Sequence, residues 1–515
     1  MSYAPALPRT AAAGWRNLEH LFDGAFGAPL NPLKHLGALA FLMLWLLAGS
    51  GIVLYVMLDT SAQGAFRSID EFSRERFGPG SLLRGLHRYA ADAFVVLTLA
   101  HLVREWVLGR FNGFRRFSWL TGVPLIPLLF VCGIVGFWLN WDRLGQFSAV
   151  ATAEWLDALP FLASPLARNF LGGAVSDRLF SLFVFVHLGV PLLLVFGLWF
   201  HIQRISRAAV FPPRALALGS TSALLALALA WPVHSQGPAE LRSVPQALSL
   251  DWFLLFIHPL TEATSAGAVW AAVVATIGGL FALPWLHRRV RAPVAVVDPA
   301  NCNGCRRCVE DCPYAAITLA PHPNGRHGVQ LAVVDPQLCA SCGICVGSCP
   351  SSTPFRGAAA LVTGIDMPQW PIDALRRRLA AGLAAMPGVQ PTVVFGCDCG
   401  ARVETLAAPG VLPLTLPCTG MLPPAFVEYA LRAGAGSVLV AGCRPGACEF
   451  RLGQRWTQQR LDGAREPRLR GSVDRARWAS AWADAGDEPA LQAALHSMRR
   501  QPGAADPCIP AQVHA

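Results

Sequence analysis

Charged side chains are scarce in this sequence: Asp, Glu, Lys and Arg make up 14% of its 515 residues, whereas hydrophobic residues make up 53%. Soluble proteins carry about 25% charged residues, so the composition is typical of a chain that is partly embedded in a membrane. Cysteine is almost absent from residues 1–290, which contain Cys132 alone, and 14 of the 15 cysteines follow later. These two absences divide the chain into an apolar first part and a cysteine-rich second part.

Several common catalytic patterns are also missing. The glycines of GAGSVLVAG precede a predicted strand and have the wrong spacing for a dinucleotide-binding motif. Neither a Ser-His-Asp arrangement nor a metal-hydrolase pattern is visible. The net charge of +10 does not require nucleic acid, because much of the arginine adjoins apolar runs, where it would set membrane topology. We therefore expect the lipid bilayer, and not nucleic acid, as a partner.

Six apolar stretches are long enough to cross a bilayer, which needs about 20 residues. They cover residues 35–58, 82–109, 119–140, 178–202, 214–232 and 266–286. Alternate loops carry unbalanced arginine and lysine, among them the segment HRRVR after the last stretch, and such loops stay in the cytoplasm. The sequence thus predicts a multi-pass protein of the bacterial inner membrane, with both termini and the cysteine-rich part in the cytoplasm.

Two of these stretches contain histidines that are fourteen residues apart, His87 with His101 and His187 with His201. Fourteen residues make almost four helical turns, so each pair lies on one helix face, about 21 Å apart along the axis. Ionisable residues inside a membrane are costly and usually functional. Because the two stretches run in the same direction, their histidines meet at two depths. This pattern predicts two b-type haems, each bound by two histidines.

Glycines repeat the same spacing in the first and third stretches. A planar macrocycle that approaches a helix edge-on needs a position without a side chain, which glycine supplies. Two arginines lie one turn from a histidine and could neutralise haem propionates. The residues expected to assist haem binding are Gly37, Gly51, Gly122, Gly136, Arg84 and Arg104. One such histidine or glycine pair would equally fit helix packing, but four repeats on four helices favour haem.

Residues 30–205 resemble the amino-terminal half of cytochrome b from quinol:cytochrome c oxidoreductases. Besides the histidines, EWLDALPFLASPL and LGGAVSDRLFSLFVFVHLGVP are similar to a loop and a helix entry of that family. The resemblance implies a periplasmic haem between His87 and His187 and a cytoplasmic haem between His101 and His201. It also implies two quinone sites, one near each membrane face.

Residues 214–287 resemble the later helices of the same family in shortened form. The family's outer quinol site carries a Pro-Glu-Trp-Tyr motif, whereas the corresponding loop here reads SLDWFLLF. Asp251 of this loop could accept a quinol proton, or the loop could be an interfacial aromatic anchor. Both interpretations stay open, and the lost proline and tyrosine argue against quinol bifurcation of the family type.

Two cysteine motifs, CNGCRRCVEDCP and CASCGICVGSCP, share the pattern C-x2-C-x2-C-x3-C-P. In two-cluster ferredoxins, which this segment resembles, the fourth cysteine of each run binds the other cluster. One [4Fe–4S] cluster is then expected on Cys302, Cys305, Cys308 and Cys349, and the other on Cys339, Cys342, Cys345 and Cys312. Zinc is the main alternative, but two full repeats with both prolines favour iron–sulfur clusters. A cytoplasmic location disfavours disulfides.

From about residue 390, short apolar strands alternate with helical stretches at 423–433 and 447–460, which indicates a small α/β domain with a mainly parallel sheet. Each of its cysteine groups follows a strand, so the thiols gather at one sheet edge. The five cysteines are Cys397, Cys399, Cys418, Cys443 and Cys448. They predict a further iron–sulfur cluster; the alternatives are reduced structural thiols or a reactive pair in FGCDCG. The tail 463–515 is expected to be mobile, with a helix near 487–500.

The motifs FGCDCG, PCTG and GCRPGAC resemble the delta subunit of methyl-viologen-reducing hydrogenase, which is found beside heterodisulfide reductases and some formate dehydrogenases. The resemblance implies a [2Fe–2S] cluster and electron exchange with a flavoprotein. Its expected ligands are Cys397, Cys418, Cys443 and Cys448. Only Asp398 separates the first two cysteines of this region, a closer spacing than is usual, so Cys399 stays an alternative to Cys397.

The fold class expected is therefore an all-α membrane helical bundle, an α+β ferredoxin-like domain and a small α/β domain with a mainly parallel sheet. The expected parts are an N-terminal cytoplasmic segment (1–34), a haem-binding four-helix bundle (35–210), two further membrane helices (211–290), the ferredoxin domain (291–356), the hydrogenase delta-like domain (390–500) and a tail (501–515).

This order of parts predicts the electron-transferring membrane subunit of a quinone-linked oxidoreductase. Electrons would pass between the quinone pool and a cytoplasmic flavoprotein or metal-containing dehydrogenase, such as subunits similar to formate dehydrogenase or heterodisulfide reductase. Quinone would be the chain's own substrate. The alternatives are an enzyme that bifurcates quinol electrons, a passive membrane anchor and a redox sensor; a homodimer is left open.

Overall fold

The computed structural model describes residues 6–160, 165–170, 175–243, 247–286, 293–323, 328–357 and 360–500. The expected HRRVR exit, the tail 501–515 and parts of the cytochrome b-like loop motifs lie outside these ranges. The chain divides into two compact units. The first comprises Met1–Gln203 and Ala208–Arg289, and the second comprises Arg204–Arg207 and Val290–Ala515.

The described part of the first unit is helical. Its α-helices are α1 (Ala6–Phe26), α2 (Leu36–Met57), α3 (Ala65–Phe72), α4 (Pro79–Val107), α5 (Arg116–Gly122), α6 (Leu125–Leu139), α7 (Arg143–Asp157), α8 (Asp177–Ile202), α9 (Arg214–Ala230), α10 (Ile257–Ala263) and α11 (Ala266–Leu286). Local signals set several of their starts. Ser176 Oγ accepts a hydrogen bond from Leu179 N at the start of α8, and α4 begins with Pro79, whose missing N–H costs nothing there.

Helices occupy all six of the expected membrane-spanning stretches, but they differ in length and polarity. Among the described residues, the segments long and apolar enough to cross a membrane are Leu36–Met57, Gly113–Leu139, Asp177–Ile202 and Ala266–Leu286. The helix α4 has 29 residues and is therefore long enough, but arginine and acidic residues make it more polar. The helix α9 has 17 residues and is shorter than the expected span. The third expected span is divided into α5 and α6, because Val123 and Pro124 lie between them.

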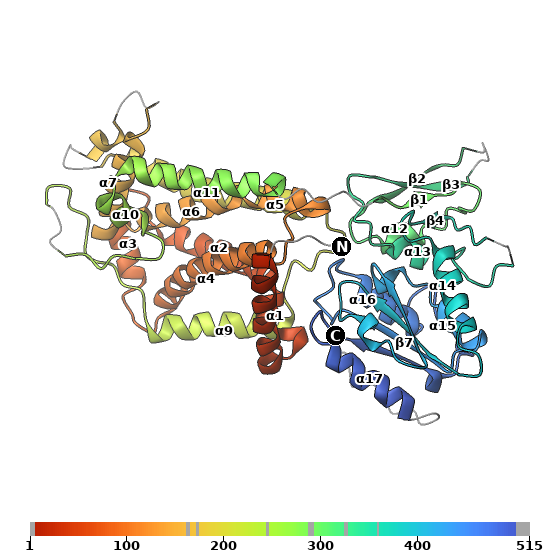
Figure 1. Cartoon of the computed structure of the whole chain (residues 1–515). Helices are drawn as coiled ribbons and strands as arrows, with labels where there is room; N and C mark the ends of the chain where they lie inside the picture. The colour runs from red at the N-terminus through yellow and green to blue at the C-terminus, as the bar shows by residue number, and fades with distance from the viewer. Residues whose placement is uncertain are drawn as a thin grey trace. The chain divides into compact units, whose positions relative to one another are not determined.

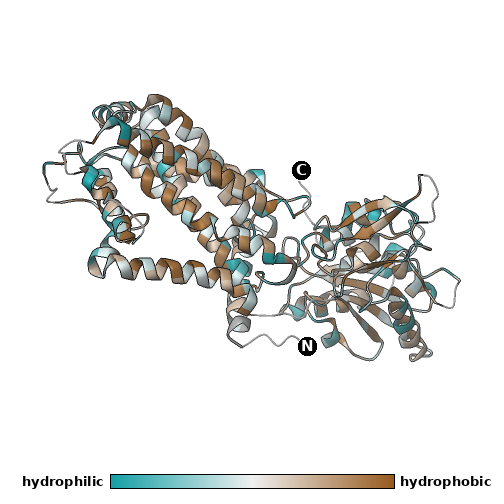
Figure 2. Ribbon diagram, turned by 90° about the horizontal axis from the view of Figure 1, so that it is seen from above, coloured by the Kyte–Doolittle hydropathy of each residue, from teal (hydrophilic) through white to brown (hydrophobic). Residues whose placement is uncertain are grey.

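Apart from α1, which runs across them, the long helices of the first unit lie alongside one another (Figure 1). The helix α2 packs on α4, and α6 packs on α8. Apolar side chains from α2, α4, α6 and α8 meet in one buried cluster that includes Met43, Phe94, Leu129 and Leu194. The hydropathy colouring shows how strongly apolar these helices are along their length (Figure 2). This cluster lies between two levels of the bundle. His87 and His187 lie at one level, and His101 and His201 lie at the other.

The ferredoxin-like part of the second unit contains two short helices, α12 (Arg307–Asp311) and α13 (Ile344–Ser348). Its strands form two antiparallel pairs, β1 (Val296–Val297) with β4 (Ile365–Asp366) and β2 (Ile317–Pro321) with β3 (Gln330–Val334). Each helix lies inside a cysteine motif, and the two helices pack on each other. The two sequence repeats thus adopt one repeated local structure.

The rest of the second unit is built on a parallel sheet with strand order β6-β5-β7-β8. The strands are β5 (Thr392–Cys397), β6 (Val411–Leu416), β7 (Ser437–Gly442) and β8 (Trp478–Trp482). Its helices are α14 (Ile372–Ala384), α15 (Ala425–Arg432), α16 (Gly453–Leu461) and α17 (Glu488–Arg500). All six residues of β5 are buried, as expected for a central strand with both faces covered. The expected fold class is confirmed.

One expectation for this region was wrong in part. The tail from residue 463 contributes the edge strand β8, which pairs with β7 from Val438↔Trp478 to Gly442↔Trp482. In the sequence of β8, WASAW, the period of a strand puts both tryptophans and the serine on one face and the two alanines on the other. Buried Leu491 and Leu495 of α17 join the same core as Leu439 of β7. The described part of the tail is therefore packed structure.

Candidate metal centres

The four membrane histidines form two pairs between α4 and α8. The ring centroids of His87 and His187 are 6.4 Å apart, and those of His101 and His201 are 6.5 Å apart. Two imidazole nitrogens that each bind a metal at about 2 Å stand about 4 Å apart. The distance from each nitrogen to the centroid of its ring adds to this span. Both measured centroid distances therefore fit one metal ion between two imidazoles.

Each of the four expected glycines lies against one of these histidine rings. A Cβ atom added to the glycine would meet the histidine Cε1 at 3.5 Å for Gly37 and His101, 3.1 Å for Gly51 and His87, 3.0 Å for Gly122 and His201, and 3.1 Å for Gly136 and His187. Carbon atoms prefer separations of about 3.5–4.0 Å. A larger residue would therefore push the imidazole away, and the glycines keep the four rings in place.

Side chains and carbonyls that the sequence analysis missed orient the imidazoles. Ser50 Oγ lies 2.9 Å from His87 Nδ1, and His187 Nδ1 donates to the Cys132 carbonyl oxygen at 3.1 Å. Thr121 Oγ1 lies 3.4 Å from His201 Nδ1. A hydrogen bond from Nδ1 leaves Nε2 free to bind a metal and makes it more basic. Ser50 and Thr121 each directly precede an expected glycine, which is the signal that could have found them.

The two arginines expected to face haem propionates have protein partners. Arg84 donates to Ser73 Oγ at 2.9 Å, to Asn140 Oδ1 at 3.2 Å and to Ser235 Oγ at 2.9 Å. Arg104 is buried, and its Nε donates to Glu19 Oε1 at 2.8 Å. The structure thus places both arginines near the bundle ends, and their contact with propionates stays a prediction.

Asp251 is held by its own loop and by α4. Its Oδ2 forms an ion pair with Arg88, while Oδ1 accepts hydrogen bonds from Phe253 N at 3.1 Å and Leu254 N at 2.8 Å. Arg88 also pairs with Asp92. These contacts give Asp251 a structural role, because they fix the turn directly before α10 and join it to α4. Its role as a quinol proton acceptor stays a prediction.

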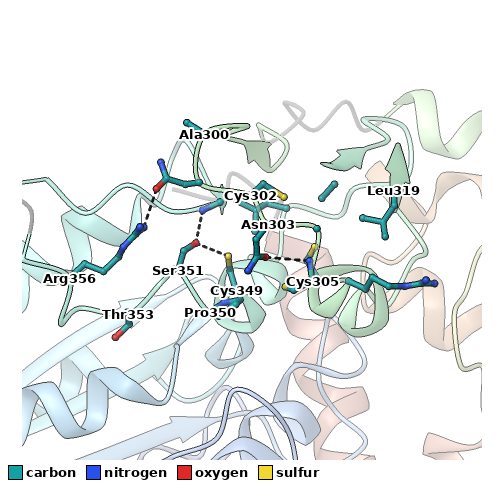
Figure 3. Close-up of a pocket in the computed structure, with 17 residues that line it drawn as sticks. Ala300, Cys302, Asn303, Cys305, Leu319, Cys349, Pro350, Ser351, Thr353 and Arg356 are labelled. Atoms are coloured by element: carbon teal, nitrogen blue, oxygen red, sulfur yellow. Dashed lines mark hydrogen bonds between the residues drawn. The ribbon is translucent and has the colours of Figure 1, made fainter. Parts of the chain in front are cut away.

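The thiols of the first expected [4Fe–4S] site gather around one pocket. The pocket has a volume of about 400 Å³, and Cys302, Cys305, Cys308 and Cys349 all line it. Figure 3 shows Cys349, from the second motif, on the same pocket as the first motif. Ser351 Oγ lies 3.0 Å from Cys349 Sγ and accepts a hydrogen bond from Gly364 N. The chain thus brings together the four cysteines that the crossed pattern groups.

The backbone of the two motifs repeats an unusual conformation. Gly304 and Ser341 have φ angles of 66° and 57°, and Arg306 and Gly343, two residues later, have φ angles of 66° and 74°. Left-handed residues of this kind turn successive N–H groups into a concave nest, which binds anions and occurs at many iron–sulfur sites. The strain at Arg306, a residue with a side chain, indicates a functional constraint on that loop.

Neighbouring thiols act on the buried cysteines of both sets. Burial and the nearby thiols of Cys349, Cys305 and Cys302 raise the pKa of Cys308 to about 12. In the second set, burial and the thiols of Cys342, Cys339 and Cys312, with a smaller effect from Cys308 of the first set, raise the pKa of Cys345 well above its ordinary value. Metal binding removes the thiol proton. Buried thiols of this kind would stay protonated without a metal, and a bound cluster would compensate the cost of their ionisation.

The five C-terminal cysteines converge at the carboxyl edge of the parallel sheet. Cys397 Sγ lies 3.8 Å from Cys443 Sγ, and the thiols of Cys397 and Cys399 both lie 3.9 Å from the Pro417 carbonyl oxygen. Hydrogen bonds from Cys399, Cys418 and Cys443 hold the pKa of Cys397 well below its ordinary value. Four of the five are buried, and Cys399 is partly exposed. The geometry fits a cluster and leaves the choice between Cys397 and Cys399 open.

Among the residues that the structure describes, no three His, Cys, Asp or Glu side chains converge closely enough to hold a single metal ion. The cysteine sets do not need such convergence, because each thiolate of a [4Fe–4S] cluster binds its own iron atom. Each histidine pair would hold one haem. Both kinds of group would supply one-electron redox chemistry, and the residues named here would hold and orient them.

A buried carboxylate beside the second set was also missed. Asp311 directly precedes Cys312 and accepts hydrogen bonds from Ser348 Oγ at 2.6 Å and from Arg465 Nε at 2.8 Å. Arg460, 149 residues away in the sequence, donates to it as well. Burial would raise the pKa of Asp311, but these partners hold that pKa below its ordinary value. Asp311 is thus an ionised buried group with several partners, at a separation that local sequence patterns do not reveal.

Three segments of the chain match known protein families. Residues 26–209 match the family cytochrome b/b6/petB. Residues 301–353 match the 4Fe-4S dicluster domain, and residues 396–501 match the delta subunit of methyl-viologen-reducing hydrogenase. The resemblances stated from the sequence, and their order along the chain, are confirmed. Three successive segments of the chain thus match three redox families, and these matches support a membrane redox subunit.

Among solved structures, one titled "Hyperthermophilic respiratory Complex III" is similar to this chain, with 20% sequence identity and a TM-score of 0.39. The similarity covers 50% of this chain and 76% of that chain.

Proposed function

We propose that this chain is the electron-transferring membrane subunit of a quinone-linked oxidoreductase complex. It relays single electrons between the quinone pool in a bacterial inner membrane and a cytoplasmic flavoprotein or metal-containing dehydrogenase. Two b-type haems, two [4Fe–4S] clusters and one [2Fe–2S] cluster carry the electrons. The dehydrogenase performs the substrate chemistry, while this chain reduces quinone or oxidises quinol.

One observation supports this proposal above the others. Two histidine pairs with metal-sized gaps and three convergent cysteine sets occur on one chain. Fusion of redox centres keeps them at high effective concentration, as a relay requires. The proposed haem ligands are His87 with His187 and His101 with His201. The proposed cluster ligands are the three cysteine sets named from the sequence, with Cys399 as the alternative to Cys397.

The proposal is tested by adding reduced quinone analogues to the full chain in vesicles and recording the haem spectrum. A ubiquinol analogue and a menaquinol analogue are both used, because the quinone type is not specified by the site. Reduction of both haems by one of them is expected in the unmodified chain. His101→Leu should leave one haem and stop electrons from reaching the cysteine sets, because it removes one ligand of the cytoplasmic pair.

A matched control uses His234→Leu, because His234 is an exposed loop residue. The haems of this variant should be reduced by the quinol analogue as in the unmodified chain. If His101→Leu left quinol-dependent reduction of the iron–sulfur clusters intact, the chain would be a passive anchor. If neither quinol analogue reduced any haem, the quinone-linked assignment would be wrong.

A further inference from the structure

A buried arginine connects both cysteine motifs to the C-terminal sheet domain. Arg460 of α16 is 1% exposed. Its Nη1 donates to the Gly420 carbonyl oxygen at 2.8 Å, and its Nη2 donates to the Ile344 carbonyl oxygen at 3.4 Å. Nη2 also donates to Ser348 Oγ at 2.7 Å and to Asp311 Oδ2 at 2.5 Å. One guanidinium thus bonds to α12, to α13 and to the loop that follows β6.

A second set of contacts closes around Asp311. Arg465 donates to Asp311 Oδ1, and Trp456 Nε1 donates to the Asp311 carbonyl oxygen at 3.1 Å. The guanidinium of Arg465 lies over the Trp456 ring, 3.5 Å from its centroid. Removal of one partner from a buried ion pair leaves an uncompensated charge, which is strongly destabilising. The end of the first motif is therefore held to α16 by charge, hydrogen bonds and an aromatic contact.

Two glycines allow the two cysteine sites to approach. A Cβ atom on Gly420 would lie 2.8 Å from Ile344 Cγ1. A Cβ atom on Gly453 would lie 2.2 Å from Cys418 Sγ and 3.6 Å from Ile344 Cδ1. Ile344 stands between Cys342 and Cys345 in the second motif and packs on the wall of the C-terminal site. Cys342 and Ile344 accordingly share one buried cluster with the C-terminal residues Cys397, Cys418, Cys443 and Cys448.

The first set of cysteines faces another environment. All residues that line its pocket lie between Ala300 and Ile365, so none comes from the C-terminal sheet domain. Cys305 of this set is exposed. Figure 3 shows Cys302, Cys305 and Cys349 together with Asn303 and Arg356 on this pocket. Among the described residues, the buried cluster around the C-terminal cysteines includes Cys342 of the second set and no cysteine of the pocket set.

We propose that Arg460 is a positioning residue that holds the set Cys312, Cys339, Cys342 and Cys345 directly against the C-terminal cysteine site. These two sites are then closest neighbours, and the pocket set of Cys302, Cys305, Cys308 and Cys349 is farther from the C-terminal site. The inference rests on the cluster assignments of the proposed function and adds an order to them. The second motif, rather than the first, is then the side of the ferredoxin domain that lies against the C-terminal site.

The order is tested by electron paramagnetic resonance on the fully reduced full chain. A neighbouring paramagnetic [4Fe–4S] cluster speeds the spin relaxation of the [2Fe–2S] signal. One ligand is changed in each set, Cys305→Ser in the pocket set and Cys339→Ser in the second set. Fast relaxation should persist in Cys305→Ser and be lost in Cys339→Ser. The opposite result would overturn the order.

The role of Arg460 is tested with Arg460→Met, Arg460→Lys and the matched control Arg470→Met, since the Arg470 side chain is 67% exposed. Arg460→Met should lose the relaxation enhancement at unchanged iron content. Arg460→Lys should restore part of it, because lysine keeps the charge but lacks the planar fork. Unchanged relaxation in Arg460→Met would overturn the role of Arg460. If that variant does not assemble, the comparison of Cys305→Ser with Cys339→Ser still tests the order of the three cysteine sites. An unmodified chain without a [2Fe–2S] signal would instead contradict the proposed function.

Discussion

A valine at Gly51 should weaken one haem site and leave the other intact. A Cβ atom at this position lies 3.1 Å from His87 Cε1, which is closer than the usual carbon–carbon contact of about 3.5–4.0 Å. Valine adds two further methyl groups in the same space. The imidazole cannot retreat without losing the contact between its Nδ1 and Ser50 Oγ at 2.9 Å. The substitution therefore acts directly on the orientation of His87.

The expected magnitude follows from the cost of overpacking, which is about 1–3 kcal/mol in a well-packed site. Since each 1.4 kcal/mol corresponds to a factor of ten, the haem affinity of this site should fall by about 5- to 150-fold. The assay measures the rate at which haem passes from the purified chain to an excess of a haem-free acceptor protein. One kinetic phase should accelerate in Gly51→Val, and the other should be unchanged.

Gly49→Val is the matched control, because it places the same side chain on the same helix where a Cβ atom meets nothing within 4 Å. It should release haem at the rate of the unmodified chain. Equal release rates for Gly51→Val and Gly49→Val would refute the assignment of Gly51 and His87 to a haem site. Acceleration of both phases would show that the variant disturbs the whole bundle.

Three other substitutions separate the roles of individual side chains. Ser50→Ala removes the Nδ1 partner of one histidine and should raise the midpoint potential of one haem by up to about 40 mV in a redox titration, given a hydrogen bond of about 1 kcal/mol; an unchanged potential would exclude this role. Cys399→Ser should retain the [2Fe–2S] resonance signal and Cys418→Ser should lose it, because Cys418 is buried and Cys399 is partly exposed; loss of the signal in both would make Cys399 a ligand.

Much of the fold could be read from local patterns. Apolar runs located the long helices, and the fourteen-residue repeats predicted that the histidines meet in pairs at two depths, since helical period and direction fix which residues meet. The glycines were expected to admit a planar macrocycle, and their contact with the histidine rings was not predicted, because it depends on how separate helices pack. The cysteine spacing grouped Cys349 with the first motif. The alternation of apolar strands and helices predicted the parallel sheet. These signals are all contained within short stretches of sequence.

The remainder depended on contacts between distant residues. The ion pair of Arg88 with Asp251 joins residues 163 apart, and that of Arg460 with Asp311 joins residues 149 apart. The periodicity within a helix or strand does not predict such pairs. The strand β8 was missed because it is short and lies in a polar tail, where pairing with β7 decides its structure. Propensity is a weak prior at such edges.

We propose that two b-type haems are each bound by two histidines of this chain, His87 with His187 and His101 with His201. The most direct measurement is the haem content of the purified chain, together with the low-spin signals of its oxidised iron. Two haems per chain are predicted for the unmodified protein, and one for His87→Leu and for His101→Leu separately. A chain purified without haem, or one whose haem content is unchanged by both substitutions, would contradict the account.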